Sequence, residues 1–83
     1  MDLKDLGRIA DYLIRCGLGV RVIPEEDYVA VQDVKHVVHW YYPEKQLAVF
    51  YRDTGLGAEK RSVENLPLNK FAYVCKHPEA LRW

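Results

Sequence analysis

Residues 34–52, with the sequence VKHVVHWYYPEKQLAVFYR, decide the fold of this chain. Two runs rich in valine and aromatic residues flank residues 43–46 (PEKQ), a pattern typical of a β-hairpin. Proline cannot adopt the positive φ that a two-residue loop needs, so we expect a four-residue loop that begins with a type I turn. The pairs expected across the hairpin are Tyr42 with Leu47, Trp40 with Val49, and Val38 with Tyr51.

This register sorts the hairpin into two faces, because side chains alternate across a strand. The first face carries His36, Val38, Trp40, Tyr42, Leu47, Val49 and Tyr51, and we predict that it is a core face. The second face carries Lys35, Val37, His39, Tyr41, Ala48, Phe50 and Arg52. A sheet with one side in water alternates apolar with polar residues, yet Val37, Tyr41 and Phe50 make the second face apolar too. Either the C-terminal segment covers these residues, or a partner protein or a second copy of the chain does.

A helix and two strands are predicted before the hairpin. Residues 2–16 carry apolar residues at helical spacing and charged residues on the other side, which predicts an amphipathic helix. Asp2 is suited to begin this helix and Gly17 to end it. Residues 19–24 and 28–32 predict short strands on either side of an acidic turn. The expected fold class is therefore α+β, with the helix packed on a four-stranded antiparallel meander.

The pattern weakens after the hairpin. Residues 53–60 predict a glycine-containing surface loop. Leu68, Phe71 and Cys75 fit helical spacing, although Phe71, Tyr73 and Cys75 fit a strand equally well. We favour a short C-terminal helix over residues 68–76, because it would lay apolar side chains over the second face of the sheet.

Length and composition narrow the class of protein. The 83 residues are 49% hydrophobic and 29% charged, which predicts one small globular domain over residues 1–83, too short for a deep enclosed pocket. No apolar run approaches the roughly 18 residues of a membrane span, and the acidic N-terminus differs from a secretory signal. We therefore expect a cytoplasmic protein without a membrane partner. Twelve basic and twelve acidic residues give zero net charge, which counts against a dedicated nucleic-acid binder.

No arrangement of residues predicts a catalytic site, a cofactor or a metal centre. His36 and His39 are an odd number of residues apart, so on a strand they would point to opposite faces. Cysteine spacing is not that of a zinc site, and we expect both cysteines to be packed thiols. Residues 53–55 resemble the D-T-G signature of aspartic proteases, but Arg52 precedes them where that family has an apolar strand. A turn at the exit of the hairpin explains these residues better.

The sequence thus predicts a non-enzymatic module, an adaptor or inhibitor that binds another protein or a second copy of itself. Tyrosine and tryptophan are enriched at binding hot spots because they combine a large area with few rotatable bonds. The predicted protein contacts are Val37, Tyr41, Phe50 and Trp83. One alternative is RNA or single-stranded DNA binding, in which rings stack on bases and basic side chains contact phosphates. That alternative would use Lys35, Tyr41, Phe50, Arg52, Lys60 and Arg61, and a small enzyme subunit is the remaining alternative.

Overall fold

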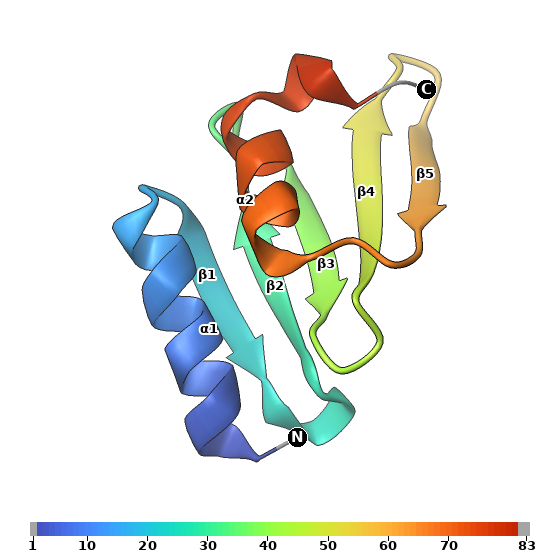
Figure 1. Ribbon diagram of the computed structural model, residues 1–83. Helices are drawn as coiled ribbons and strands as arrows, with labels where there is room; N and C mark the ends of the chain where they lie inside the picture. Colours follow the sequence, from blue (N-terminus) through green and yellow to red (C-terminus); the bar gives the residue numbers. More distant parts are fainter. Residues whose placement is uncertain (1, 82–83) are drawn as a thin grey trace.

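The computed structural model describes residues 2–81, which form two α-helices and an antiparallel sheet (Figure 1). The sheet has five strands in the order β1-β2-β3-β4-β5, so each strand pairs with its neighbour in sequence. The α+β meander is confirmed, but the prediction of four strands was wrong. The elements are α1 (Leu3–Arg15), β1 (Gly19–Ile23), β2 (Tyr28–Gln32), β3 (Val38–Tyr42), β4 (Leu47–Asp53), β5 (Ala58–Val63) and α2 (Leu68–Lys76), with 3-10 turns η1 (Pro24–Glu26) and η2 (Pro78–Ala80).

Helix α1 begins and ends as its sequence predicts. A side-chain oxygen of Asp2 accepts a hydrogen bond of 2.9 Å from the backbone N–H of Asp5, which caps the first turn. At the other end Gly17 has a φ of 88°, and the N–H of Leu18 donates to the carbonyl of Leu13. This is a Schellman end, which requires a residue that tolerates the left-handed conformation. The buried residues of α1 are Leu6, Ala10 and Leu13.

Strands β3 and β4 form the predicted hairpin with two of its three predicted pairs, while Val38 and Tyr51 lie beyond the ladder, which ends at Trp40 and Val49. Trp40 lies opposite Val49, and Tyr42 lies opposite Leu47. Residues 43–46 form the connecting turn, in which the N–H of Lys45 donates to the carbonyl of Tyr42. The hairpin was predictable because its loop length and its proline fix the register locally.

Strand β5 is the element that the sequence analysis did not predict. Its sequence, AEKRSV, has no apolar alternation, and every residue before Val63 is exposed. Its ladder with β4 runs from Ala48 opposite Val63 to Asp53 opposite Ala58, and this pairing holds it in place. Gly55 and Gly57 have positive φ and close the tight connection between the two strands. The predicted 53–60 loop is therefore shorter than expected, since Asp53 ends β4, Ala58 begins β5 and only residues 54–57 connect them.

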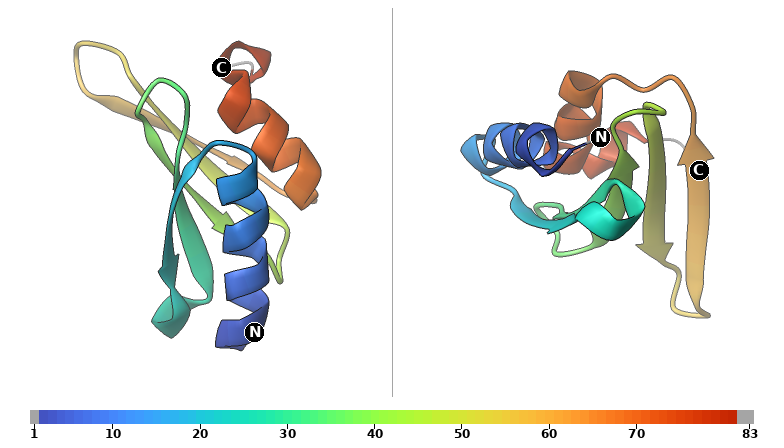
Figure 2. Two further views of the ribbon diagram at one scale, coloured as in Figure 1. Left: turned by 90° about the vertical axis from the view of Figure 1, so that its left-hand side faces the viewer. Right: turned by 90° about the horizontal axis from the view of Figure 1, so that it is seen from below.

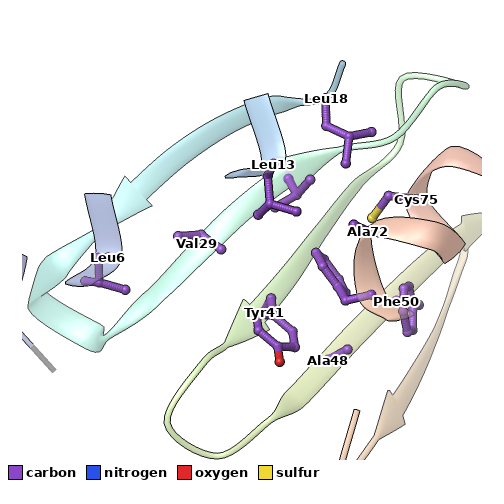
Figure 3. Packing of buried hydrophobic residues seen from close by; sticks show 11 residues of the cluster. Leu6, Leu13, Leu18, Val29, Tyr41, Ala48, Phe50, Ala72 and Cys75 are labelled. Atoms are coloured by element: carbon purple, nitrogen blue, oxygen red, sulfur yellow. The ribbon is translucent and has the colours of Figure 1, made fainter. Parts of the chain in front are cut away.

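Both α-helices lie on the same side of the sheet, which leaves the opposite side uncovered by either (Figure 2). The core fills the space between these helices and the sheet (Figure 3). From helix α2, Phe71 stacks on Tyr41 of β3 with ring centroids 4.6 Å apart and lies 5.6 Å from the ring of Phe50 on β4. The buried core cluster consists of Leu6, Leu13, Leu18, Val29, Val31, Tyr41, Ala48, Phe50, Phe71, Ala72 and Cys75.

The prediction of which hairpin face lies in the core was wrong. Tyr41, Ala48 and Phe50 are each at most 1% exposed, so the second face is the one that is sealed. The cause is α2, which covers this face with Phe71 and Cys75. The favoured helix over residues 68–76 is confirmed. None of the helices in the described residues is long and apolar enough to cross a membrane.

Replacing Phe71 with alanine should lower the free energy of unfolding by about 3–5 kcal/mol, because the change leaves a cavity beneath α2. Phe71 is fully buried against two aromatic rings. Urea unfolding followed by circular dichroism measures the effect. Tyr73→Ala is the matched control on the same helix, since Tyr73 is 57% exposed, and it should cost about 0.5 kcal/mol or less. Equal losses for the two variants would contradict the packing described above.

Candidate functional site

One side of the sheet faces away from both helices (Figure 2). The strand register assigns side chains to it, because partners in a ladder point to the same face. Neither α1 nor α2 covers this surface, which we call the open face. Its apolar members are Ile23, Tyr28, Ala30, Val38, Trp40, Tyr42, Leu47, Val49 and Tyr51.

Four aromatic rings form a continuous cluster across β2, β3 and β4 on the open face. Tyr28 lies 5.4 Å from Trp40 and 5.0 Å from Tyr42, and Trp40 meets Tyr51 edge to face at 5.6 Å. All four side chains remain partly exposed. Val38 lies two residues before Trp40 on the same face of β3, and its side chain is 46% exposed. The cluster is therefore stabilised by cross-strand ring contacts and still offers apolar area to solvent.

Charged residues of both signs lie around the two ends of the aromatic cluster. At one end Nζ of Lys45 lies 5.8 Å from the centre of the Tyr42 ring, and burial, followed by the charges of Tyr28, Glu26 and Tyr51, raises the pKa of Tyr42. At the other end Lys60 on β5 lies directly opposite Tyr51. Asp53 follows two residues after Tyr51 on the same face, so this end too carries both signs of charge.

The predicted protein contacts do not form an exposed surface. Tyr41 and Phe50 are each 1% exposed, because Phe71 of α2 packs on them. Val37 is half-buried. Trp83 lies outside the described residues. The prediction that Tyr41 and Phe50 meet a partner therefore disagrees with their burial within one chain.

The basic residues of the nucleic-acid alternative are divided between the two faces of the sheet. Lys60 lies on the open face, whereas Arg52 and Arg61 extend from the face that carries Phe50. Arg52 forms a salt bridge of 2.8 Å with Glu59. Lys35 is exposed in the turn between β2 and β3. Since Tyr41 and Phe50 are buried, they cannot stack on bases, and this set of residues does not form one binding surface.

A buried hydrogen-bond network joins the β2–β3 turn to β4. Nδ1 of His39 accepts the backbone N–H of Tyr51 at 3.0 Å, so the ring proton lies on Nε2 and is donated to Asp33 at 2.8 Å. The second carboxylate oxygen of Asp33 accepts the N–H groups of Lys35 and Val37. Both ring nitrogens of His39 are therefore engaged within the chain. The buried pair Asp33 and His39 therefore holds the turn and β4 together, and His39 has no free ring nitrogen to act as a general base.

The other histidine and cysteine side chains do not lie together in one site. His36 is exposed whereas His39 is buried. Within residues 2–81 no group of three or more histidine, cysteine or acidic side chains could hold a metal ion. Cys16 and Cys75 are free thiols, and Cys75 is fully buried. Burial, and secondarily Asp33, raise the pKa of Cys75 to about 12, so it is not a reactive thiolate.

A cleft of about 450 Å³ lies between the end of β4 and the segment that follows α2. Asp33 and His39 form part of its floor, and their polar atoms are bonded to one another. Among the described residues no buried side-chain nitrogen or oxygen lacks a hydrogen-bond partner. The cleft therefore presents no unpaired buried group that would fix a polar ligand. The remaining lining residues are Lys35, Val37, Phe50, Tyr51, Arg52, Asp53, Val74, Pro78, Glu79 and Leu81.

Neither a protein-family model, nor a curated protein, nor a solved structure matches this chain. The functional argument therefore depends on the geometry of the chain itself.

Sequence reasoning placed the exposed aromatic residues in the core, although a signal for their position was available in β2. There the buried Val29 and Val31 alternate with Tyr28, Ala30 and the polar, exposed Gln32, so the two faces of β2 differ in polarity. The observed register puts Gln32 opposite Val38, on the face of Trp40, and Val29 opposite Tyr41. Knowing that register would have identified the open face.

The two thiols should differ sharply in reactivity. We expect iodoacetamide to label Cys16, which is only half-buried, and to leave Cys75 unmodified in the folded protein. Both should react in concentrated urea. Mass spectrometry after a timed reaction distinguishes these outcomes, and equal labelling of both thiols in buffer would contradict the burial of Cys75.

The free energy of unfolding should fall at alkaline pH because of the buried Cys75 thiol. Its pKa is about 12 in the folded chain, against an ordinary value of 9.0. Above pH 9 the unfolded chain releases this proton while the folded chain retains it, so the thiol removes about 1.4 kcal/mol of stability per pH unit between the two values. Cys75→Ala lacks this group and should lose stability less steeply over that window. Urea unfolding at successive pH values measures both slopes, and parallel slopes would contradict the raised pKa.

Proposed function

We propose that this protein is a non-enzymatic protein-binding module that uses the open face as its contact surface. The single observation that carries the proposal is the cluster of Tyr28, Trp40, Tyr42 and Tyr51, four partly exposed rings on a sheet face that neither helix covers. Such rings are the residues most often found at interface hot spots. The proposal keeps the class of function predicted from sequence but moves the contact surface to the opposite side of the sheet.

The geometry of the rings favours a protein over a nucleic acid as the partner. Bases stack on flat, accessible ring faces. Here Trp40 meets Tyr51 at 71°, and Tyr28 lies against both Trp40 and Tyr42, so the rings cover part of one another. The chain as a whole also has no net charge, which disfavours binding to a phosphate backbone. These features fit the apolar and polar mixture of a protein interface.

Two side chains, His39 and Cys75, support a function without catalysis. His39 has both ring nitrogens engaged by Asp33 and Tyr51, and the raised pKa of Cys75 keeps its thiol protonated. Two free cysteines also fit a reducing compartment, so we propose a cytoplasmic location.

Replacing Trp40 with serine should weaken binding of the protein's partner by about thirtyfold or more, as expected for loss of a hot-spot residue. Tyr51→Ser should act in the same direction. Affinity is measured by sedimentation equilibrium for self-association, or by calorimetry with a purified partner. Circular dichroism and thermal unfolding establish that each variant keeps its fold.

Tyr12→Ser is the matched control, since Tyr12 is a tyrosine on α1 that is 40% exposed and lies away from the open face. It should leave binding unchanged. Two results would overturn the proposal. One is unchanged affinity in folded Trp40→Ser and Tyr51→Ser variants. The other is salt-sensitive binding of single-stranded RNA that depends on Trp40, which would establish the nucleic-acid alternative.

A further inference from the structure

The backbone ladder between β3 and β4 ends at Trp40 and Val49, and a side chain continues the connection beyond it. There the backbone N–H of Tyr51 donates to Nδ1 of His39 at 3.0 Å. Nε2 of the same ring donates to Asp33 at 2.8 Å. The imidazole thus joins β4 to the turn between β2 and β3. We call the arrangement of Asp33, His39 and Tyr51 the histidine clasp.

A second proton on His39 has one place to go. Nε2 already carries the proton that it donates to Asp33, so an added proton must occupy Nδ1. Nδ1 then becomes a donor that points at the backbone N–H of Tyr51, which is also a donor. Turning the ring over does not remove the conflict, because both nitrogens of an imidazolium are donors. The protonated ring and the Tyr51 N–H therefore cannot remain bonded.

The cleft between the end of β4 and the segment after α2 gives a proton access to the clasp. It is lined by both Asp33 and His39, although the His39 residue is only 5% exposed. Protonation therefore does not require the core to unfold first.

The surroundings of the clasp contain charges of both signs. From α2, Cys75 is coupled to Asp33, and burial, with a smaller effect of Asp33, raises its pKa to about 12, so the thiol is neutral in acid. From β4, Phe50 presents an uncharged ring 5.3 Å from the imidazole. The charged side chains that line the cleft or flank it from β5 are Lys35, Arg52, Asp53, Glu59, Arg61 and Glu79. Three are basic and three are acidic, so their effects on a charged ring oppose one another.

We propose that the histidine clasp is an acid-sensitive switch, in which a second proton on His39 releases the backbone N–H of Tyr51 and frees the end of β4 from β3. The ladder between β4 and β5 runs on to Asp53 and contains no histidine, so the same proton does not release it. Trp40 meets Tyr51 edge to face at 5.6 Å, so the release also changes the surroundings of the indole. The switch is a property of the chain alone, and its test needs no binding partner.

Nuclear magnetic resonance at about pH 7.5 and about pH 5.0 tests the switch, because histidine side chains in general gain a proton across this range. The chain used carries His36→Asn and His77→Gln, which leaves His39 as its single histidine. Asparagine suits position 36, where φ is 69°. The ring nitrogen shifts report the protonation of His39, and the hydrogen-exchange protection factor of the Tyr51 amide reports its hydrogen bond.

The protection factor of Tyr51 should fall at least tenfold between the two pH values, because an equilibrium linked to one proton changes up to about tenfold per pH unit. The ring nitrogens of His39 should report double protonation over the same range. The amide of Leu66 is the internal control, since it donates to the backbone carbonyl of Gln46 at 2.8 Å and no histidine takes part. Its protection factor should stay unchanged.

Two substitutions separate the two bonds of the clasp without a titrating ring. Asparagine at position 39 places an amide oxygen near the position of Nδ1, whereas glutamine places an amide nitrogen near that of Nε2. His39→Asn should therefore keep Tyr51 protected at both pH values. His39→Gln should leave Tyr51 as poorly protected at neutral pH as the histidine chain is in acid. Circular dichroism establishes that each variant is folded, and the titration with His39 intact decides the question even if neither folds.

Three results would overturn the switch. The first is a His39 ring that carries two protons in acid while the Tyr51 amide stays protected. The second is a His39 ring that stays neutral at the lower pH, whatever happens to Tyr51. The third is an equal loss of protection at Leu66 and Tyr51, which would show that acid unfolds the whole chain and does not release β4 locally.

Discussion

Phe71 of α2 lies between the ring of Tyr41 on β3 and the ring of Phe50 on β4, and the arrangement of the sheet follows from this packing. Burial of three large apolar side chains contributes several kcal/mol, which is a large part of the stability of a small domain. Once α2 occupies that side, the alternation of the strands forces Trp40, Tyr42 and Tyr51 to the other side. The exposure of the open face is therefore a consequence of where α2 docks.

Local features of the fold could be predicted from the sequence because their causes are local. The cap at Asp2 and the left-handed end at Gly17 bound α1, and the four-residue turn with Pro43 fixes the β3–β4 register. Strand β5 could not be predicted in this way. Its charged and polar residues carry no period, and its backbone ladder with β4 alone makes it a strand.

The face assignment failed because it depends on a contact that sequence pattern does not encode. Both sides of the hairpin are apolar, so periodicity cannot tell which side faces the core. The register of β2 against β3 would have shown which side shares a face with Val29 and Val31. That register is set by the connection over residues 33–37. There Asp33 holds two backbone N–H groups and the ring of His39, while His39 accepts the N–H of Tyr51. This buried network could not be read from the H-x-x-H spacing, which suggested only that the two histidines point apart.

The same network bears on how firmly the open face is held. At the end of the β3–β4 ladder, Tyr51 donates its backbone N–H to the side chain of His39. The ring of Tyr51 therefore projects from a segment fixed by a buried acceptor, next to Trp40. A surface of rings held by cross-strand contacts and by such anchors loses little conformational freedom on binding. Cross-strand ring contacts would stabilise the sheet equally well if the rings were fully covered, so the area that all four rings still expose is the feature that a binding surface explains and sheet stability alone does not.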